Sequence, residues 1–296
     1  MTLHRALRKA WSLALATAIS LRLGRKRRDD LAFVEAAHQR VMRRPVDPDM
    51  QDRLLGLLAE GRPRRIVVEA LLLQLFVERL HALRSRAVAQ LPPAEVLVDL
   101  GGASPVHPGG VLMSMGYPHR PAEITIVDLP TTTDHTPVEE RVWGQTKVRC
   151  LYRSMVDLSP LPDESVDGVW AGQSLEHVTL AEARQTVREV RRVLKPGGWF
   201  CLDTPNRDLT RRQSPHGWIH PQHQMEYTPA QLQELLTDAG LELVCLRGLA
   251  LMPWTQRTGL FWPGEIRPDA PGSDSPSGCY IIFATTRKPA ATETNT

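Results

Sequence analysis

Four short apolar runs recur between residues 96 and 203 of the 296-residue chain, and they constrain its fold more than any other feature. The runs are five residues long and rich in aliphatic or aromatic side chains: Val96–Leu100, Ile124–Asp128, Val166–Trp170 and Trp199–Asp203. Such runs predict strands that are buried on both faces. Residues 180–194 carry apolar side chains at helical spacing between the last two runs. Alternating strands and helices predict an α/β fold with a doubly wound, Rossmann-like sheet.

The pattern continues toward the C-terminus. Thr228 and Gln231 form a capping box, which predicts the start of another helix. Strands are predicted after it at residues 241–246 and 280–285. Residues 263–278, rich in Pro, Gly, Ser and Asp, are predicted to be the loop between these strands.

Residues 29–91 show no strand pattern and predict a small helical domain. Apolar residues recur at helical spacing in three segments: 31–41, 54–58 and 66–83. The dipeptide Pro92–Pro93 then separates this helical part from the sheet-forming part.

Residues 1–28 carry eight basic and no acidic side chains, although the net charge of the chain is only +3. The apolar stretch 11–23 is too short to span a membrane. A basic amphipathic segment of this kind can lie on an anionic membrane surface, pack on its own protein or fray, and the sequence leaves these readings open. The four cysteines form no CxxC pair, which favours a reducing compartment. The expected location is the cytoplasm. If residues 1–28 lie on a membrane, we expect peripheral contact at the inner membrane surface.

Polar motifs stand at the ends of the predicted strands. Asp99 is followed by Gly101 and Gly102, and a glycine-rich turn lets a ligand approach the backbone. Asp128 ends the second strand, where a carboxylate can accept hydrogen bonds from both hydroxyls of a ribose. Asp157 follows later and could accept a hydrogen bond from an adenine amino group. Together these motifs predict a nucleoside-binding crevice at the carboxyl ends of the strands.

The order of the motifs resembles that of the class I S-adenosylmethionine-dependent methyltransferases. The resemblance rests on VLVDLGGAS, ITIVD, MVDLSPLPDESVDGVWAGQSLEHV and REVRRVLKPGGWFCLDTPN. It implies a seven-stranded sheet with the last strand antiparallel and S-adenosylmethionine as cofactor. The implied methyltransferase domain covers residues 92–290, and residues 291–296 are expected to be a disordered tail.

The same resemblance implies which residues hold the cofactor. They are Asp99, Gly101, Gly102 and Ala103 at the methionine end, Asp128 and Leu129 at the ribose, Met155, Val156 and Asp157 at the adenine, and Gln173 near the sulfonium. The chain departs from the family pattern in the glycine motif, where Ala103 and Pro105 replace the second and third glycines. These two replacements narrow and stiffen the turn.

Candidate catalytic residues follow the fourth motif. Methyl transfer depends mainly on aligning a nucleophile with the methyl group, but an oxygen nucleophile also needs a base. Glu176 and His177 stand where the chain crosses the expected cofactor mouth, and His216, His220 and His223 precede the capped helix. His177 or His223 could accept the proton.

Two other interpretations of these histidines stay open. Some O-methyltransferases hold a divalent metal with an ExxEH motif and a later histidine. In this chain Gln173 replaces the first acid, which removes a charge that Mg²⁺ would favour, and no metal ligand is assigned. The histidines could also have a structural role only.

The N-terminal part gives an indication of the acceptor. Residues 33–48 resemble the start of a small helical domain found in bacterial surface-glycan proteins, with His38 at a position usually held by Tyr. This resemblance favours O-methylation of a saccharide or cell-surface glycan precursor. Three aromatic residues before the last strand could stack on a sugar or simply pack: Trp254, Phe261 and Trp262.

Alternative functions also stay open. The acceptor could be a small aromatic or quinone-like metabolite. RNA is less favoured, because the basic run at Arg207, Arg211 and Arg212 is thin. The chain could instead be a non-catalytic scaffold of a glycan assembly complex that keeps the methyltransferase fold.

Overall fold

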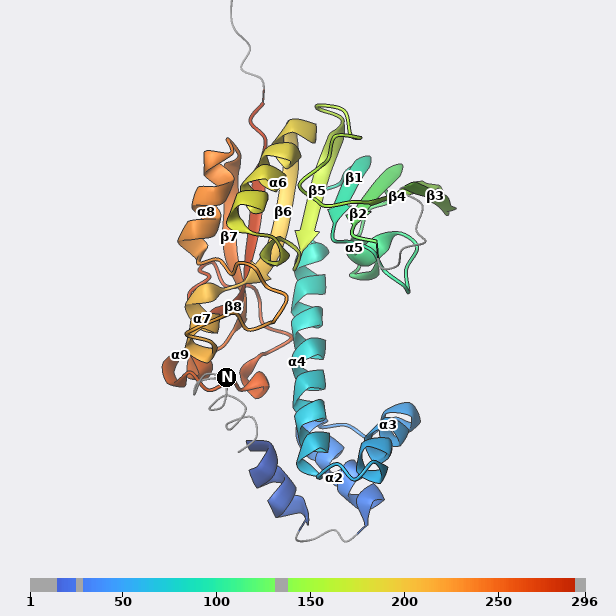
Figure 1. Ribbon diagram of the computed structural model, residues 1–296, viewed down its shortest axis with the longest axis vertical. Helices are drawn as coiled ribbons and strands as arrows, with labels where there is room; N and C mark the ends of the chain where they lie inside the picture. The colour runs from blue at the N-terminus through green and yellow to red at the C-terminus, as the bar shows by residue number, and fades with distance from the viewer. Residues whose placement is uncertain (1–14, 25–28, 131–137, 291–296) are drawn as a thin grey trace, which may run out of the picture.

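The computed structural model describes residues 15–24, 29–130 and 138–290. Within these residues the chain forms one eight-stranded sheet with the order β3-β4-β2-β1-β5-β6-β8-β7 (Figure 1). The bounds of the strands are β1 Val96–Leu100, β2 Glu123–Asp128, β3 Val138–Trp143, β4 Thr146–Tyr152, β5 Val166–Gly172, β6 Leu194–Pro205, β7 Glu242–Leu251 and β8 Cys279–Arg287.

The predicted doubly wound α/β sheet is confirmed, but its count of seven strands is wrong. The described sheet has eight strands, because β3 forms an antiparallel hairpin with β4 at the sheet edge. Gly144, with φ of +61°, makes the tight turn between them. The last strand, β8, is antiparallel as predicted and lies between β6 and β7.

Helices cover the two faces of the sheet. One face packs against α6 (Leu180–Val193) and α8 (Pro229–Asp238), each of which begins with a threonine capping box. The other face packs against α5 (Gly110–Ser114) and the C-terminal part of α4 (Arg65–Val88). Shorter elements lie near the carboxyl ends of the strands: η1 Leu175–His177, α7 Arg207–Gln213, α9 Pro253–Thr258 and η2 Pro263–Glu265. The last of these lies within the predicted loop 263–278.

The helices predicted in the N-terminal part are confirmed as α2 (Asp30–Met42), α3 (Pro48–Ala59) and a longer α4. They bury their own apolar cluster around Phe33 and Leu71. His38 lies in this cluster, only 1% exposed, and its Nδ1 lies 2.9 Å from the carbonyl oxygen of Arg44.

Residues 15–24 are helical and pack against the same apolar cluster through Leu15, Ile19 and Leu23. This part of the basic segment therefore packs on its own protein. The remainder of segment 1–28, and the tail at 291–296, lie outside the described residues. No helix in the described ranges is long and apolar enough to cross a membrane.

Helix α4 joins the two parts of the molecule (Figure 1). Its N-terminal half contributes to the helical cluster, whereas Leu83 and Val88 lie in the core of the sheet. Arg79 donates hydrogen bonds to three carbonyl oxygens of segment 263–266, at distances from 2.7 to 3.3 Å. Phe76 stacks edge-on against Phe261. The helical part is thus fixed to the edge of the sheet at which the parallel strands end.

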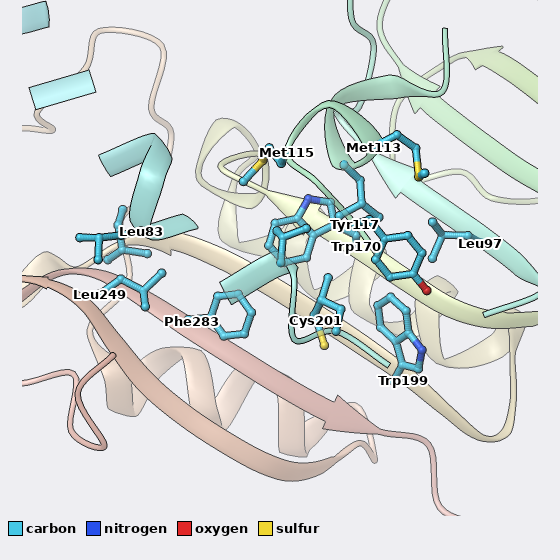
Figure 2. Packing of buried hydrophobic residues seen from close by; sticks show 14 of the residues in the cluster. Leu83, Leu97, Met113, Met115, Tyr117, Trp170, Trp199, Cys201, Leu249 and Phe283 are labelled. Atoms are coloured by element: carbon cyan, nitrogen blue, oxygen red, sulfur yellow. The ribbon is translucent and has the colours of Figure 1, made fainter. Parts of the chain in front are cut away.

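The sheet core is tightly packed around Trp199 (Figure 2). Gly168 of β5 lies beside Trp199 of β6 in the sheet. A Cβ on Gly168 would lie 2.3 Å from two atoms of the Trp199 indole ring. Glycine is therefore required at this position because the indole occupies the space of a side chain.

We expect Gly168→Ala to destabilise the fold by ~1–3 kcal/mol, because the added methyl group must displace the Trp199 ring. Chemical denaturation measures this loss. Gly56→Ala is the matched control: a Cβ there meets nothing within 4 Å on helix α3, so it should stabilise the protein by up to ~1 kcal/mol. Equal stability of the Gly168→Ala variant and the native protein would contradict this packing.

Candidate functional site

A cavity of about 470 Å³ lies at the carboxyl ends of β1, β2 and β5. Six of the residues predicted for the site line it: Gly101, Asp128, Leu129, Met155, Gln173 and His177. The sequence did not point to the other lining residues, which are Val127, Arg153, Ser154, Ser174, Val178 and Gln222. A crevice at the carboxyl ends of the strands is the position that a doubly wound sheet offers to a ligand.

The glycine turn after β1 depends on the burial of Asp99. The Asp99 carboxylate accepts a hydrogen bond from the Leu112 amide at 3.0 Å, and burial raises its pKa to about 7. A Cβ on Gly102 would lie 2.1–2.5 Å from the carboxylate atoms of Asp99. Asp99 and Gly102 therefore do not line the cavity; they shape the turn from beneath. Gly101 has a φ of +72°, and a Cβ at this position would lie 2.7 Å from the Cβ of Ser174. Glycine therefore allows the turn to approach Ser174 closely.

Asp128 links the turn to the end of β2. Its two carboxylate oxygens accept hydrogen bonds from the amides of Ala103, at 3.0 Å, and Leu129, at 2.8 Å. Each oxygen has a second lone pair, so the carboxylate can still accept two hydroxyl groups. Ala103 contacts Asp128 through its backbone amide and not through its side chain. This hydrogen bond therefore forms without the glycine that the family pattern has at this position.

The segment 155–157 contributes less to the cavity than the sequence suggested. Met155 lines it, but Val156 and Asp157 are not among its lining residues. The Asp157 side chain is 53% exposed and pairs with Arg153 at 2.8 Å. Asp157 therefore acts on the cavity through Arg153, which is itself a lining residue.

Gln173 lies at the mouth of the cavity in a left-handed conformation, with φ of +55°. Its amide Nε2 donates to Asp203 at 3.0 Å, and its backbone N–H donates to the carbonyl oxygen of the same residue at 2.9 Å. Asp203 is fully buried and also accepts two hydrogen bonds from Arg84 of α4, at 2.6 and 3.0 Å. An arginine outside the predicted catalytic domain thus fixes a residue of the cavity.

Glu176 is almost completely buried beneath the cavity. Its Oε2 accepts a hydrogen bond from Thr204 at 3.0 Å, whereas its Oε1 has no hydrogen-bond partner among the residues that the structure describes. Burial raises the pKa of Glu176 to about 8. This carboxyl group is therefore mostly protonated at neutral pH.

Three histidines gather at the mouth. The ring centroid of His177 lies 5.1 Å from that of His223 and 6.3 Å from that of His220. His177 is exposed and lines the cavity. Part of the ring is surrounded by protein, and this partial desolvation, followed by the neighbouring His223, lowers the pKa of His177 below its ordinary value. A neutral imidazole therefore faces the cavity at physiological pH.

Glu226 orients His223 from below. The Glu226 side chain is fully buried, and one of its carboxylate oxygens lies 2.9 Å from His223 Nδ1. Burial alone would raise the pKa of Glu226, but hydrogen bonds from His223 and Thr210 hold it below its ordinary value. An ionised Glu226 can only accept, so His223 donates to it from Nδ1.

Glu176, His177 and His223 place their ligand atoms within 4.8 Å of one another. This group has the composition of a small metal site. The burial of Glu176 favours its neutral form, however, and Gln173 donates to Asp203 instead of offering a second carboxylate. A hard divalent cation prefers charged oxygen ligands. The group fits a proton acceptor better than a magnesium site.

Comparisons with known proteins agree with this architecture. Residues 108–202 match the model of a family described as "Methyltransferase domain". A "probable S-adenosylmethionine-dependent methyltransferase" of Mycolicibacterium smegmatis is 45% identical over 84 residues, which are 28% of this chain and 32% of that protein. The match therefore spans about a third of that relative. A ubiquinone biosynthesis O-methyltransferase of Xanthomonas oryzae pv. oryzae is 29% identical over 195 residues, 61% of this chain and 79% of that protein.

Solved structures share the fold. A SAM-dependent methyltransferase of Thermotoga maritima has a TM-score of 0.51 and 18% identity, covering 72% of this chain and 92% of its own. A methyltransferase from a complex with the Haloferax volcanii activator Trm112 has a TM-score of 0.50 and 19% identity, covering 72% of this chain and 91% of its own. At these identities the likeness concerns the fold alone.

We expect Glu176→Gln to remove a pH dependence of stability. The pKa of Glu176 is about 8 in the folded protein and near 4.5 when unfolded, so the native protein binds the proton more tightly. Stability is then highest below about pH 4.5 and falls as the pH rises toward 8. Above that pH the variant should be more stable than the native protein by at least ~1 kcal/mol.

Denaturant titrations across this range measure the effect, with Glu234→Gln on the exposed face of α8 as control. Asp99 has a raised pKa of the same sign, so the difference between variant and native protein isolates Glu176. Parallel stability curves for the two proteins would show that Glu176 is ionised in the fold.

Proposed function

We propose that this chain, a class I S-adenosylmethionine-dependent methyltransferase, methylates a hydroxyl group and uses His177 as the base. The observation that carries the proposal is the neutral imidazole of His177 at the mouth of the cofactor cavity. A hydroxyl group must lose its proton as it is methylated, whereas a thiolate or an amine lone pair needs no such base.

The residues of the cavity fit the cofactor. Asp128 keeps free lone pairs for the two ribose hydroxyls, and Gly101, which packs closely against Ser174, lines the same cavity. The Ser174 hydroxyl is buried at the same wall and has no hydrogen-bond partner in the described part of the chain, so it remains available to a bound ligand. When bound, S-adenosylmethionine supplies an activated methyl group on its sulfonium. The remaining residues bind and orient, and His177 removes the proton of the acceptor.

The neighbours of His177 support this role. His223, held by Glu226, packs edge-on against the His177 ring at an interplanar angle of 85°. A proton that arrives on His177 lies near this imidazole and near the buried Glu226 carboxylate. Glu226 thereby stabilises the protonated state of the pair without contacting the acceptor. In this proposal His177 acts directly, His223 and Glu226 position it, and Glu176 forms the floor.

We propose a saccharide or glycan precursor as the acceptor. The helical domain at 29–91, on whose resemblance this rests, includes α4, which reaches the end of the sheet at which the parallel strands end (Figure 1). Arg84 of α4 pairs with Asp203, and Asp203 accepts a hydrogen bond from Gln173 at the cavity. Of the aromatic residues considered for stacking, Phe261 packs on the sheet core and Trp262 on the helical cluster. Trp254 is 38% exposed and remains available for a sugar.

A second candidate acceptor is an aromatic hydroxyl. It is favoured by the similarity to ubiquinone biosynthesis O-methyltransferases over 79% of their length. The RNA alternative loses support, because Arg207 pairs with Glu226 and Arg211 with Asp208. Contact of residues 1–28 with a membrane surface stays a prediction, as does the boundary between the helical and catalytic domains at 91/92.

An acceptor panel tests the choice between these substrates. Methyl glycosides, nucleotide sugars and catechols are incubated with the protein and S-adenosylmethionine that carries a labelled methyl group. Transfer to a sugar hydroxyl supports the first candidate, and transfer to catechols alone supports the second. Transfer only to amines would refute hydroxyl methylation.

We expect Asp128→Ala to weaken binding of S-adenosylhomocysteine by roughly 100-fold, because two charge-assisted hydrogen bonds are lost. Isothermal titration measures the affinity. The control is Asp163→Ala, whose carboxylate is 74% exposed and pairs with Arg192 away from the cavity. Absence of binding to the native protein would favour the non-catalytic scaffold instead.

We expect His177→Gln to lower kcat by ~10²–10⁴-fold, the usual contribution of a general base. The lowered pKa of His177 places the acid limb of the native pH–rate profile below the ordinary value of 6.5. Activity is lost as the pH falls through that limb, because the base becomes protonated. The control is His81→Gln, because the His81 side chain is exposed on α4. If the His177→Gln variant keeps the acid limb of the pH–rate profile, another residue is the base.

A further inference from the structure

A second cavity of about 300 Å³ lies far from the histidines, between the C-terminal half of α4 and strands β7 and β8. Residues 270–272 close one side of it. It shares no lining residue with the cofactor cavity. Its size is at the lower end of the range for small-molecule sites, ~300–1,000 Å³.

The floor of this cavity is apolar. Leu83, Leu249 and Phe283 line it, and they lie together at one end of the sheet core (Figure 2). On this face the sheet packs against α4 and α5, whereas α6 and α8 pack on the opposite face. The floor therefore offers an aromatic or aliphatic group a surface that is already formed.

Two arginines stand at the same cavity. Arg86 donates to the carbonyl oxygen of Pro268 at 2.9 Å. Arg247 donates to Cys245 Sγ at 3.0 Å and reaches Gln90 Oε1 at 3.5 Å. Among the described residues neither guanidinium has a carboxylate within ion-pair distance, and no acidic residue lines the cavity. No described carboxylate therefore compensates the positive charge of this site.

We propose that this cavity binds a small amphipathic anion, with its apolar body on the floor and its carboxylate, sulfonate or phosphate group against Arg86 and Arg247. Guanidinium groups bind such oxyanions through paired hydrogen bonds, and each arginine keeps N–H groups that are not used within the chain. A neutral ligand would leave the two charges uncompensated, and a large one would exceed the volume. The proposal does not depend on the reaction or on the acceptor.

The test uses 1-anilinonaphthalene-8-sulfonate, a fluorescent sulfonate with an aromatic body, added to the full-length protein. We expect saturable binding of one equivalent. The double substitution Arg86→Gln/Arg247→Gln should weaken it at least roughly tenfold, the effect of losing one charge-assisted contact. N-phenyl-1-naphthylamine, which has the same body without the sulfonate, should bind the native protein and the double variant equally.

A second pair of variants tests the charge without removing an arginine. Val244 lines the cavity and is 60% exposed on β7. Val244→Asp should repel the sulfonate and weaken its binding, whereas the similarly shaped Val244→Asn should not. Arg188→Gln, on α6 at the opposite face, serves as a control for net charge. Thermal unfolding verifies that each variant is folded. Absence of saturable binding, or equal affinities for Val244→Asp and Val244→Asn, would overturn the proposal.

Discussion

The buried ion pair between Arg84 and Asp203 is the interaction on which the arrangement of the site depends. Asp203 lies near the C-terminal end of β6 and accepts a hydrogen bond from Gln173, whose backbone is left-handed. Arg84, its ion-pair partner, belongs to α4, the helix that connects the N-terminal part to the sheet. Removing one partner of such a pair leaves an uncompensated buried charge, at a cost of about 3–5 kcal/mol. The position of α4, the end of β6 and the mouth of the cofactor cavity are therefore determined together.

Other buried acids organise the site in the same way. Asp99 shapes the glycine turn from beneath, Glu176 forms the floor, and Glu226 orients His223. Their environments differ: burial favours the neutral form of Asp99 and Glu176, whereas hydrogen bonds keep Glu226 ionised. Residues that line the cavity are thus placed by carboxyl groups that do not line it.

The strand and helix pattern predicted the α/β sheet and the N-terminal helices, because these depend on local periodicity. The antiparallel last strand was predicted from the resemblance to the methyltransferase family and not from periodicity. The β3–β4 hairpin was missed, because VEERVW alternates too weakly to mark a buried strand and no strand was predicted at TKVRCLY. Motif order located Asp128, Gln173 and His177 at the cavity. It could not locate Arg84, since a pairing 119 residues apart leaves no local signal. The resemblance also implied Asp99 at the methionine end of the cofactor, and Asp99 is not among the residues that line the cavity.

The course of α4 has a consequence for the modular history of the chain. Leu83, Val88 and Leu91 belong to the core of the sheet, although all three precede the proline pair at which the sequence divides. A gene fusion or exchange with its junction at that point would separate the catalytic fold from part of its own interior. Recombination could retain the fold only with a junction upstream of Arg79, within the helix. Helix α4 therefore belongs to the interior of both parts, and a division at residue 92 cuts through the sheet core.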